Sequence, residues 1–179
     1  MDRRKLSLEE LGRLDVDAFK KQKKNEIILV ADNIRSALNI GSLFRTADAF
    51  NLQELICVGI SATPPHKEIN KTAIGATLSV EWSHMEDILP YLNSKKKEGY
   101  KVVSNEQTTE SKLLKEVDNT IGKKLIVIMG NEVSGVQQDI IDVSDEVVEI
   151  AQYGTKHSLN VTVCAGIVLW HLTSMRNKV

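Results

Sequence analysis

The strongest constraint on the fold is the regular alternation of short apolar runs with longer segments of helical spacing. The apolar runs have the length and composition of buried strands and lie at 27–30, 55–58, 100–104, 125–129 and 147–150. Helical spacing appears at 39–50, 85–97, 136–142 and 158–175. Strands that are joined through helices must pair in parallel, with the helices packed over the sheet. The sequence therefore predicts an α/β fold with a mostly parallel sheet and helices on both faces.

Local signals predict where several elements begin or end. Ser7 and Glu10 have the spacing of a capping box, which predicts a short helix that starts at Ser7. Asn51 follows the helical segment 39–50, and we expect it to adopt a left-handed conformation, because Asn tolerates positive φ better than most residues. Ser158 is a good N-cap residue and predicts the start of the last helix.

The first 24 residues differ in charge from the rest of the chain. They carry eight Lys and Arg residues against five Asp and Glu residues, whereas the whole chain has a formal net charge of -1. Four of the lysines form a cluster: Lys20, Lys21, Lys23 and Lys24. We interpret residues 1–24 as a short basic extension and residues 25–179 as one domain. The extension is either a solvated arm or a segment that contacts phosphate groups.

Composition excludes several classes of protein. At 42% hydrophobic and 26% charged residues, the chain has the balance of a soluble globular protein. It has no apolar run of the roughly 20 residues that span a membrane, and its first residues lack the apolar core of a secretory signal. Cys57 and Cys164 have no CxxC partner, and the histidines are scattered, so we expect no metal site. We expect a cytoplasmic protein with reduced thiols.

Three polar segments follow predicted strands, at the sheet edge where open α/β proteins bind ligands. In the first, Asn39 starts a helix and Arg45 offers a planar fork suited to phosphate. In the second, Gly130 and Gly135 flank Glu132, and two glycines would permit close approach of the backbone to a ligand. Each pattern also has a plain structural explanation, namely a capped helix with a surface arginine and a turn with an exposed acid.

The third polar segment opens the last helix, where Ser158 and Asn160 would lie beside free backbone N–H groups. Simple helix capping would explain this segment as well. Taken together, N-x-G-x-x-x-R-T-A at 39–47, G-N-E-x-x-G at 130–135 and S-L-N-V-x-V at 158–163 resemble the motifs of the SpoU (TrmH) family. These proteins are RNA ribose 2′-O-methyltransferases of the SPOUT superfamily. The resemblance covers about residues 25–175.

The resemblance implies a fold, a cofactor, an assembly and a set of site residues. The fold would contain a deep trefoil knot at its C-terminal end, the cofactor would be S-adenosylmethionine, and the active site would lie at the interface of a homodimer. The implied catalytic residues are Asn39, Arg45, Glu132, Ser158 and Asn160. The implied cofactor-binding residues are Asn105, Glu106, Gly130, Ile150 and Leu159. The expected RNA-binding residues are Arg45, Lys20, Lys21, Lys23 and Lys24.

Some roles stay open at this level. A guanidinium is a poor base, so Arg45 suits a phosphate clamp that also stabilises a developing alkoxide. Glu132 could pair with Arg45 or face the sulfonium charge. His157 is expected to be a surface residue. Ala151 stands where the family usually has proline, so the cofactor loop would be less preorganised.

The substrate follows less directly from the sequence. The segments 98–108 and 148–154 and the helix around Trp170 look most like the branch that methylates a guanosine at position 18 in the D-loop of tRNA. No large N-terminal RNA-binding domain is visible, which favours tRNA over ribosomal RNA. The alternatives are a ribosomal RNA methyltransferase and a catalytically silent RNA-binding factor of the same fold.

Overall fold

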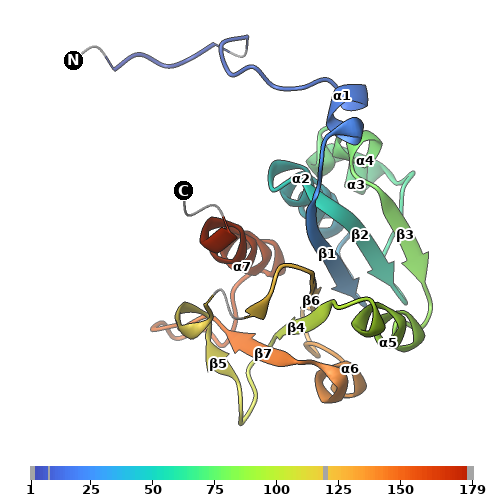
Figure 1. Ribbon diagram of the computed structural model, residues 1–179, viewed down its shortest axis with the longest axis vertical. Helices are drawn as coiled ribbons and strands as arrows, with labels where there is room; N and C mark the ends of the chain where they lie inside the picture. Colours follow the sequence, from blue (N-terminus) through green and yellow to red (C-terminus); the bar gives the residue numbers. More distant parts are fainter. Residues whose placement is uncertain (1–2, 8, 119–120, 177–179) are drawn as a thin grey trace.

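The computed structural model describes residues 3–7, 9–118 and 121–176. Its strands form one seven-stranded sheet in the order β3-β2-β1-β6-β4-β7-β5, and the pairings between these strands are parallel (Figure 1). The strands are β1 (Asn25–Asp32), β2 (Leu52–Val58), β3 (Trp82–Met85), β4 (Lys101–Asn105), β5 (Lys112–Leu113), β6 (Leu125–Met129) and β7 (Glu146–Glu149). The predicted parallel α/β class is confirmed. The knot concerns how the C-terminal segment threads past earlier loops, and it stays a prediction.

Helices cover both faces of the sheet, as predicted. They are α1 (Val16–Lys21), α2 (Ala37–Ala49), α3 (Lys67–Ala73), α4 (Ala76–Ser79), α5 (Leu89–Lys97), α6 (Gln138–Val143) and α7 (Val161–Arg176), with a 3-10 turn η1 at Leu114–Glu116. Alternate residues of β1 point to opposite faces. Ile27 and Leu29 join a buried cluster with α2, α3 and α7, whereas Ile28 and Val30 join one with α5 and α6.

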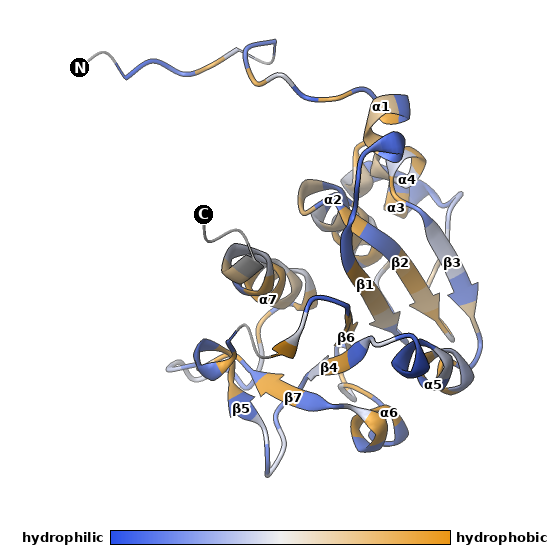
Figure 2. Ribbon diagram, in the orientation of Figure 1, coloured by the Kyte–Doolittle hydropathy of each residue, from blue (hydrophilic) through white to orange (hydrophobic). Residues whose placement is uncertain are grey.

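Hydropathy follows this layering. The central strands carry most of the hydrophobic colour, and the N-terminal arm and α5 are largely hydrophilic (Figure 2). Within the described ranges, no helix combines the length and the apolar character that a membrane crossing would need.

The prediction of a short helix that starts at Ser7 is partly wrong. The capping-box hydrogen bonds form, since Ser7 N–H donates to Glu10 over 2.7 Å and Glu10 N–H donates to the Ser7 hydroxyl over 3.3 Å. The described residues that follow form only a turn, because Gly12 takes a left-handed φ of 57° and ends it; Leu8 lies outside the described residues. The helix of this region is α1, whose N-cap is Asp15.

Other boundaries shift for local reasons. Met85 ends strand β3 rather than starting a helix, and α5 begins at Leu89 with a proline in its first turn. The last helix begins at Val161 rather than at Ser158, because the side chain of Asn160 accepts a hydrogen bond from Thr162 N–H over 2.9 Å.

Two further observations concern the ends of α2. Asn51 has the predicted left-handed conformation, with φ of 49°. At the other end, Ser36 is the N-cap and accepts a hydrogen bond from Asn39 N–H, so α2 starts before the predicted position.

The first motif contains a glycine because α2 and α3 pack very closely. A Cβ on Gly41 would lie 2.1 Å from the Thr72 hydroxyl and 2.3 Å from the Ile69 carbonyl oxygen. The Thr72 hydroxyl donates to the Leu38 carbonyl over 2.8 Å, which joins the two helices at this point. The absence of a side chain at Gly41 therefore places α3 directly beside the helix that carries Arg45.

Candidate functional site

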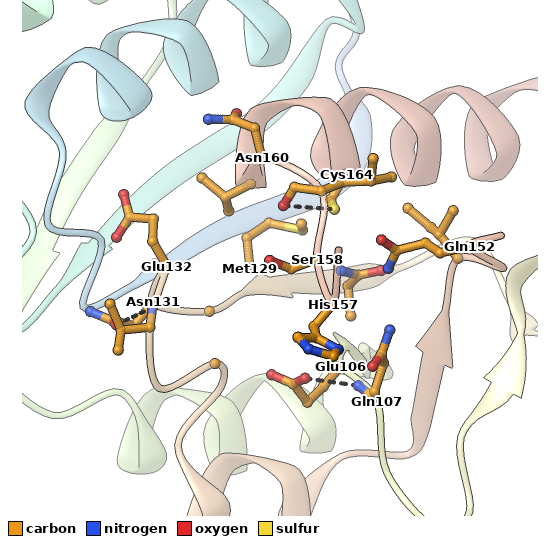
Figure 3. Close-up of a pocket in the computed structure, with 17 residues that line it drawn as sticks. Glu106, Gln107, Met129, Asn131, Glu132, Gln152, His157, Ser158, Asn160 and Cys164 are labelled. Carbon is orange, nitrogen blue, oxygen red and sulfur yellow. Dashed lines mark hydrogen bonds between the residues drawn. The ribbon is translucent and has the colours of Figure 1, made fainter. Parts of the chain in front are cut away.

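A cavity of about 480 Å³ opens at the carboxyl edge of the sheet (Figure 3). Asn105 at the end of β4 pairs in register with Met129 of β6 and Val148 of β7, so these three strands end side by side. The residues that follow each strand line the cavity. The lining includes all five residues predicted to bind a cofactor: Asn105, Glu106, Gly130, Ile150 and Leu159. Three of the predicted catalytic residues also line it: Glu132, Ser158 and Asn160.

The loop of the second motif folds back on its own first residue. A Cβ on Gly130 would lie 2.3 Å from both the Gly135 carbonyl carbon and the Val136 nitrogen. Asn131 and Gly135 exchange two backbone hydrogen bonds of 3.0 Å, and the Asn131 side chain donates to the Asn33 carbonyl over 2.6 Å. We expected Gly130 to allow close approach to a ligand. The described contact is instead with the protein's own backbone, and it gives the loop its shape.

Glu106 holds the far end of this loop. Its carboxylate accepts hydrogen bonds from Val136 N–H over 2.9 Å and from Gln107 N–H over 2.8 Å. Gly135 has a left-handed φ of 70°, and a Cβ there would lie 2.1 Å from the Glu106 carboxylate. Both glycines of the motif are thus required by the packing of the cavity wall.

A chain of hydrogen bonds joins the three motifs. The Glu132 carboxylate accepts from Arg35 N–H over 2.9 Å, from Ser36 N–H over 3.2 Å and from the Asn39 side-chain amide over 2.8 Å. The Asn39 side-chain oxygen in turn accepts from the Asn160 amide over 3.2 Å. Glu132 therefore stabilises the N-terminus of α2, where free N–H groups and the helix dipole favour an anion. Asn39 connects this carboxylate to the start of α7.

The same contacts determine the acidity of Glu132. Partial burial acts to raise the pKa of its carboxyl group, but the hydrogen bonds from Arg35, Asn39 and Ser36 outweigh burial and hold the pKa below its usual value of 4.5.

We predict that Glu132→Gln lowers the free energy of unfolding at pH 7 and makes that free energy depend less on pH in the acid range. A group with a lowered pKa contributes stability above its unfolded pKa, and that contribution is lost as the pH falls through the folded pKa. The variant places an amide against N–H donors, and because the site is exposed we expect a loss of about 1 kcal/mol at pH 7. Urea denaturation from pH 7 down to pH 3 measures both effects. Equal stability of the two proteins at pH 7 would contradict the capping role.

Arg45 and the predicted RNA-binding lysines lie outside this cavity. Arg45 lines a neighbouring cavity with residues from the start of α7, and the described partners of Glu132 do not include Arg45. Lys20 and Lys21 belong to the last turn of α1. Lys24 donates to the Phe19 carbonyl over 2.8 Å and lies 3.3 Å from the centre of the Phe19 ring. Lys23 is exposed just after α1. The structure thus brings Asn39, Glu132, Ser158 and Asn160 together but leaves Arg45 apart within one chain.

Sequence reasoning missed several residues of the cavity wall. Gln107, Gln152, His157 and Cys164 also line it. His157 is exposed in a loop, as expected, but its place in the cavity wall was not predicted. Burial raises the pKa of the Cys164 thiol, while the Asn105 side chain acts in the opposite direction. The only signal in the sequence was their proximity to the motifs. Among the described residues, no group of three or more His, Cys, Asp and Glu side chains could hold a metal ion.

Comparison with known proteins gives the family. A model described as the SpoU rRNA Methylase family matches residues 26–170, which include all three motifs. The chain belongs to the SpoU rRNA Methylase family. The resemblance seen in the three motifs is confirmed.

Individual proteins resemble this chain over most of its length. The Aquifex aeolicus tRNA (guanosine(18)-2'-O)-methyltransferase is 30% identical over 163 residues, which are 88% of this chain and 73% of that protein. The crystal structure of the A. aeolicus TrmH/SpoU tRNA modifying enzyme has a TM-score of 0.79 at 28% identity, covering 91% of this chain and 81% of the other. The structure of an AdoMet-bound rRNA methyltransferase from Sinorhizobium meliloti has a TM-score of 0.76 at 25% identity. The match covers 85% of this chain and 57% of that chain.

Proposed function

We propose that this protein transfers a methyl group from S-adenosylmethionine to a ribose 2′-hydroxyl of RNA, and that its substrate is the guanosine at position 18 of tRNA. The observation that carries this proposal is the hydrogen-bonded chain from Glu132 through Asn39 to Asn160, which brings three separate motifs to the mouth of one cavity. The activity named for the Aquifex relative supports the choice of tRNA. The ribosomal RNA substrate named for the Sinorhizobium protein is the second candidate.

The cavity fits the cofactor in size and in chemistry. Its volume of about 480 Å³ lies within the range of small-molecule sites. The side-chain oxygen of Asn105 is buried and has no hydrogen-bond partner in the described structure. It could accept a hydrogen bond from a ligand donor such as an adenine amino group. Gly130, Ile150 and Leu159 would hold the cofactor from the surrounding loops. When bound, S-adenosylmethionine supplies an electrophilic methyl group on a positively charged sulfur.

The protein's own residues must then position the ribose 2′-hydroxyl and help it to lose its proton. Asn39, Ser158 and Asn160 are neutral hydrogen-bonding groups that would orient the ribose. Arg45 would bind the adjacent phosphate and stabilise the alkoxide that develops as the hydroxyl loses its proton. A guanidinium stays protonated in proteins, so a phosphate oxygen or a water takes that proton.

A second copy of the chain completes the site in this proposal. Arg45 does not line the cofactor cavity of its own chain, so the arginine of one protomer would act on the cofactor bound by the other. Helix α7, which borders both cavities, carries exposed apolar side chains at Val163, Ile167 and Trp170, with Trp170 63% exposed. Their spacing places them along one face of the helix, where a homodimer would bury them.

The basic extension 1–24 and the cellular location complete the proposal. Lys20, Lys21, Lys23 and Lys24 would contact RNA phosphates outside the catalytic cavity. We place the protein in the cytoplasm, in keeping with its two free thiols.

The direct test combines cofactor binding with methyl transfer. We expect calorimetry to show binding of S-adenosylmethionine, and a tRNA transcript to accept a methyl group at guanosine 18. A matched transcript with a single 2′-deoxyguanosine at that position should accept none, because it lacks the acceptor oxygen. Transfer to 23S ribosomal RNA alone would select the second candidate. Cofactor or RNA binding without transfer to any RNA would identify a silent binding factor and contradict the proposal.

A further inference from the structure

The cavity beside Arg45 has an unusual electrostatic character. It has a volume of about 510 Å³ and lies where α2, α3 and the start of α7 meet. Arg45 comes from α2 and Lys71 from α3, and no carboxylate is among the described residues that line the cavity. Two cations thus line one cavity whose described lining includes no carboxylate, while Arg45 also borders a second cavity that contains Asp15 and Asp48.

The other polar groups of this cavity are already engaged. The hydroxyls of Ser42, Thr46 and Thr72 donate to backbone carbonyl oxygens, and the Thr162 hydroxyl donates to the Asn160 side chain. An anion that enters the cavity would therefore be held by the two cations. Within the described chain, neither Arg45 nor Lys71 has an ion pair, and both are exposed.

Arg45 and Lys71 carry like charges and line the same cavity, so each repels the other. The close packing at Gly41 places α3 against α2, and the hydrogen bond from Thr72 to Leu38 joins the helices next to Lys71. A phosphodiester group would offset the repulsion. Its two non-bridging oxygens match the Arg45 fork, and Lys71 would supply a point charge to the same or the next phosphate.

The rim of the cavity suits a nucleic-acid backbone. Ile74 also lines the cavity and is 69% exposed. Ile74 has a left-handed φ of 50°, which is rare for a β-branched residue and ends α3 three residues after Lys71. The exposed Ile74 side chain provides a surface for a sugar ring beside the two cations that would bind the phosphate.

We propose that Lys71 is an RNA-binding residue that acts with Arg45 to hold the phosphate next to the target ribose. This inference rests on the proposed function, since it assigns the phosphate contact of that same substrate. It adds a second cation to the one expected from the family motif. Lys71 binds substrate in this arrangement and does not contact the cofactor, because it lies outside the cofactor cavity.

The test compares two lysines of the same helix. Lys67 is exposed at the other end of α3 and does not line the cavity, so Lys67→Ala is the matched control for Lys71→Ala. We expect Lys71→Ala to weaken tRNA binding about fivefold at 0.1 M salt and to reduce the slope of log K against log salt by about 0.7 to 0.9, as for one lost phosphate contact. Lys67→Ala should change neither quantity, and Lys71→Arg should retain both.

Three controls keep the outcome clear. Cofactor affinity by calorimetry and thermal stability should match the wild type in all three variants, since a purely structural role of Lys71 would move stability without moving the salt slope. If Lys71→Ala behaves as Lys67→Ala does while the wild type methylates tRNA, the inference is overturned and the proposed function stands. If Lys71→Ala instead changes the oligomeric state in sedimentation, Lys71 serves a contact between protomers and the inference is overturned. A wild type that neither binds nor methylates RNA overturns both.

Discussion

Arg45→Ala is expected to lower the rate of methyl transfer by at least about 10³-fold while the affinity for S-adenosylmethionine stays within about twofold of the wild type. Loss of one group that stabilises a developing oxyanion costs about 10²–10³ in rate, and loss of the phosphate contact adds to that cost. Cofactor affinity should be preserved because Arg45 does not line the cofactor cavity of its own chain. Single-turnover kinetics with saturating tRNA and calorimetry with the cofactor measure the two quantities separately.

A second variant, Arg45→Lys, separates the charge from the geometry, because it keeps the positive charge and removes the planar fork. We expect it to fail almost as completely, because a lysine presents a point charge and cannot bind two phosphate oxygens in parallel. Full activity of Arg45→Lys would contradict the phosphate clamp. A parallel loss of cofactor binding in Arg45→Ala would show that the arginine shapes the cofactor site instead.

Mixing two inactive variants tests whether the site is shared between protomers. Arg45→Ala and a variant with a damaged cofactor cavity should restore part of the activity when they are combined, since a mixed dimer would contain one intact site. The physical basis is the separation of Arg45 from the cofactor cavity within one chain. No recovery in a demonstrably mixed dimer would contradict the shared site.

The sequence predicted five of the seven strands, because each of these five contains a short apolar run that suits a buried strand. It missed the strands β3 and β5 and the helices α1, α3 and α4, which have between two and seven residues and are too short to show a clear periodicity. It also predicted a helix at Ser7, where the capping hydrogen bonds do form but Gly12 prevents continuation. Short-range signals thus identify contacts more reliably than they identify the length of an element.

The site was predicted in outline for a related reason. Parallel strands end at one edge, so the polar residues that follow them were expected to converge, and most of them do. The partners of Glu132 could not be predicted, because two of them are backbone N–H groups of Arg35 and Ser36, 97 and 96 residues away. Backbone donors carry no signature in the sequence. The position of Arg45 outside the cofactor cavity of its own chain could not be read from the residues either, although the family resemblance implied a site at a homodimer interface.

Gly130→Ala is expected to cause the largest loss of structure at the site. The added Cβ would lie 2.3 Å from two backbone atoms of residues 135 and 136, which cannot rotate away as a flexible side chain could. Overpacking typically costs about 1–3 kcal/mol, and we expect this variant to lie at the upper end because the clash is with backbone. The loop that carries Glu132 must then move, so the cap on α2 and the wall of the cofactor cavity are disturbed together. We expect cofactor affinity to fall at least about tenfold.

Gly154→Ala is the matched control, because a Cβ on Gly154 would meet no atom within 4 Å and its φ is not in the left-handed region. We expect this variant to keep the stability and the cofactor affinity of the wild type in urea denaturation and calorimetry. If Gly130→Ala behaved like Gly154→Ala, the loop 131–135 would be able to shift without cost, and its tight return onto Gly130 would not be what shapes the cavity. A loss confined to Gly130→Ala would instead mean that the glycine of the second motif is required by the backbone behind the cofactor site, before any ligand is present.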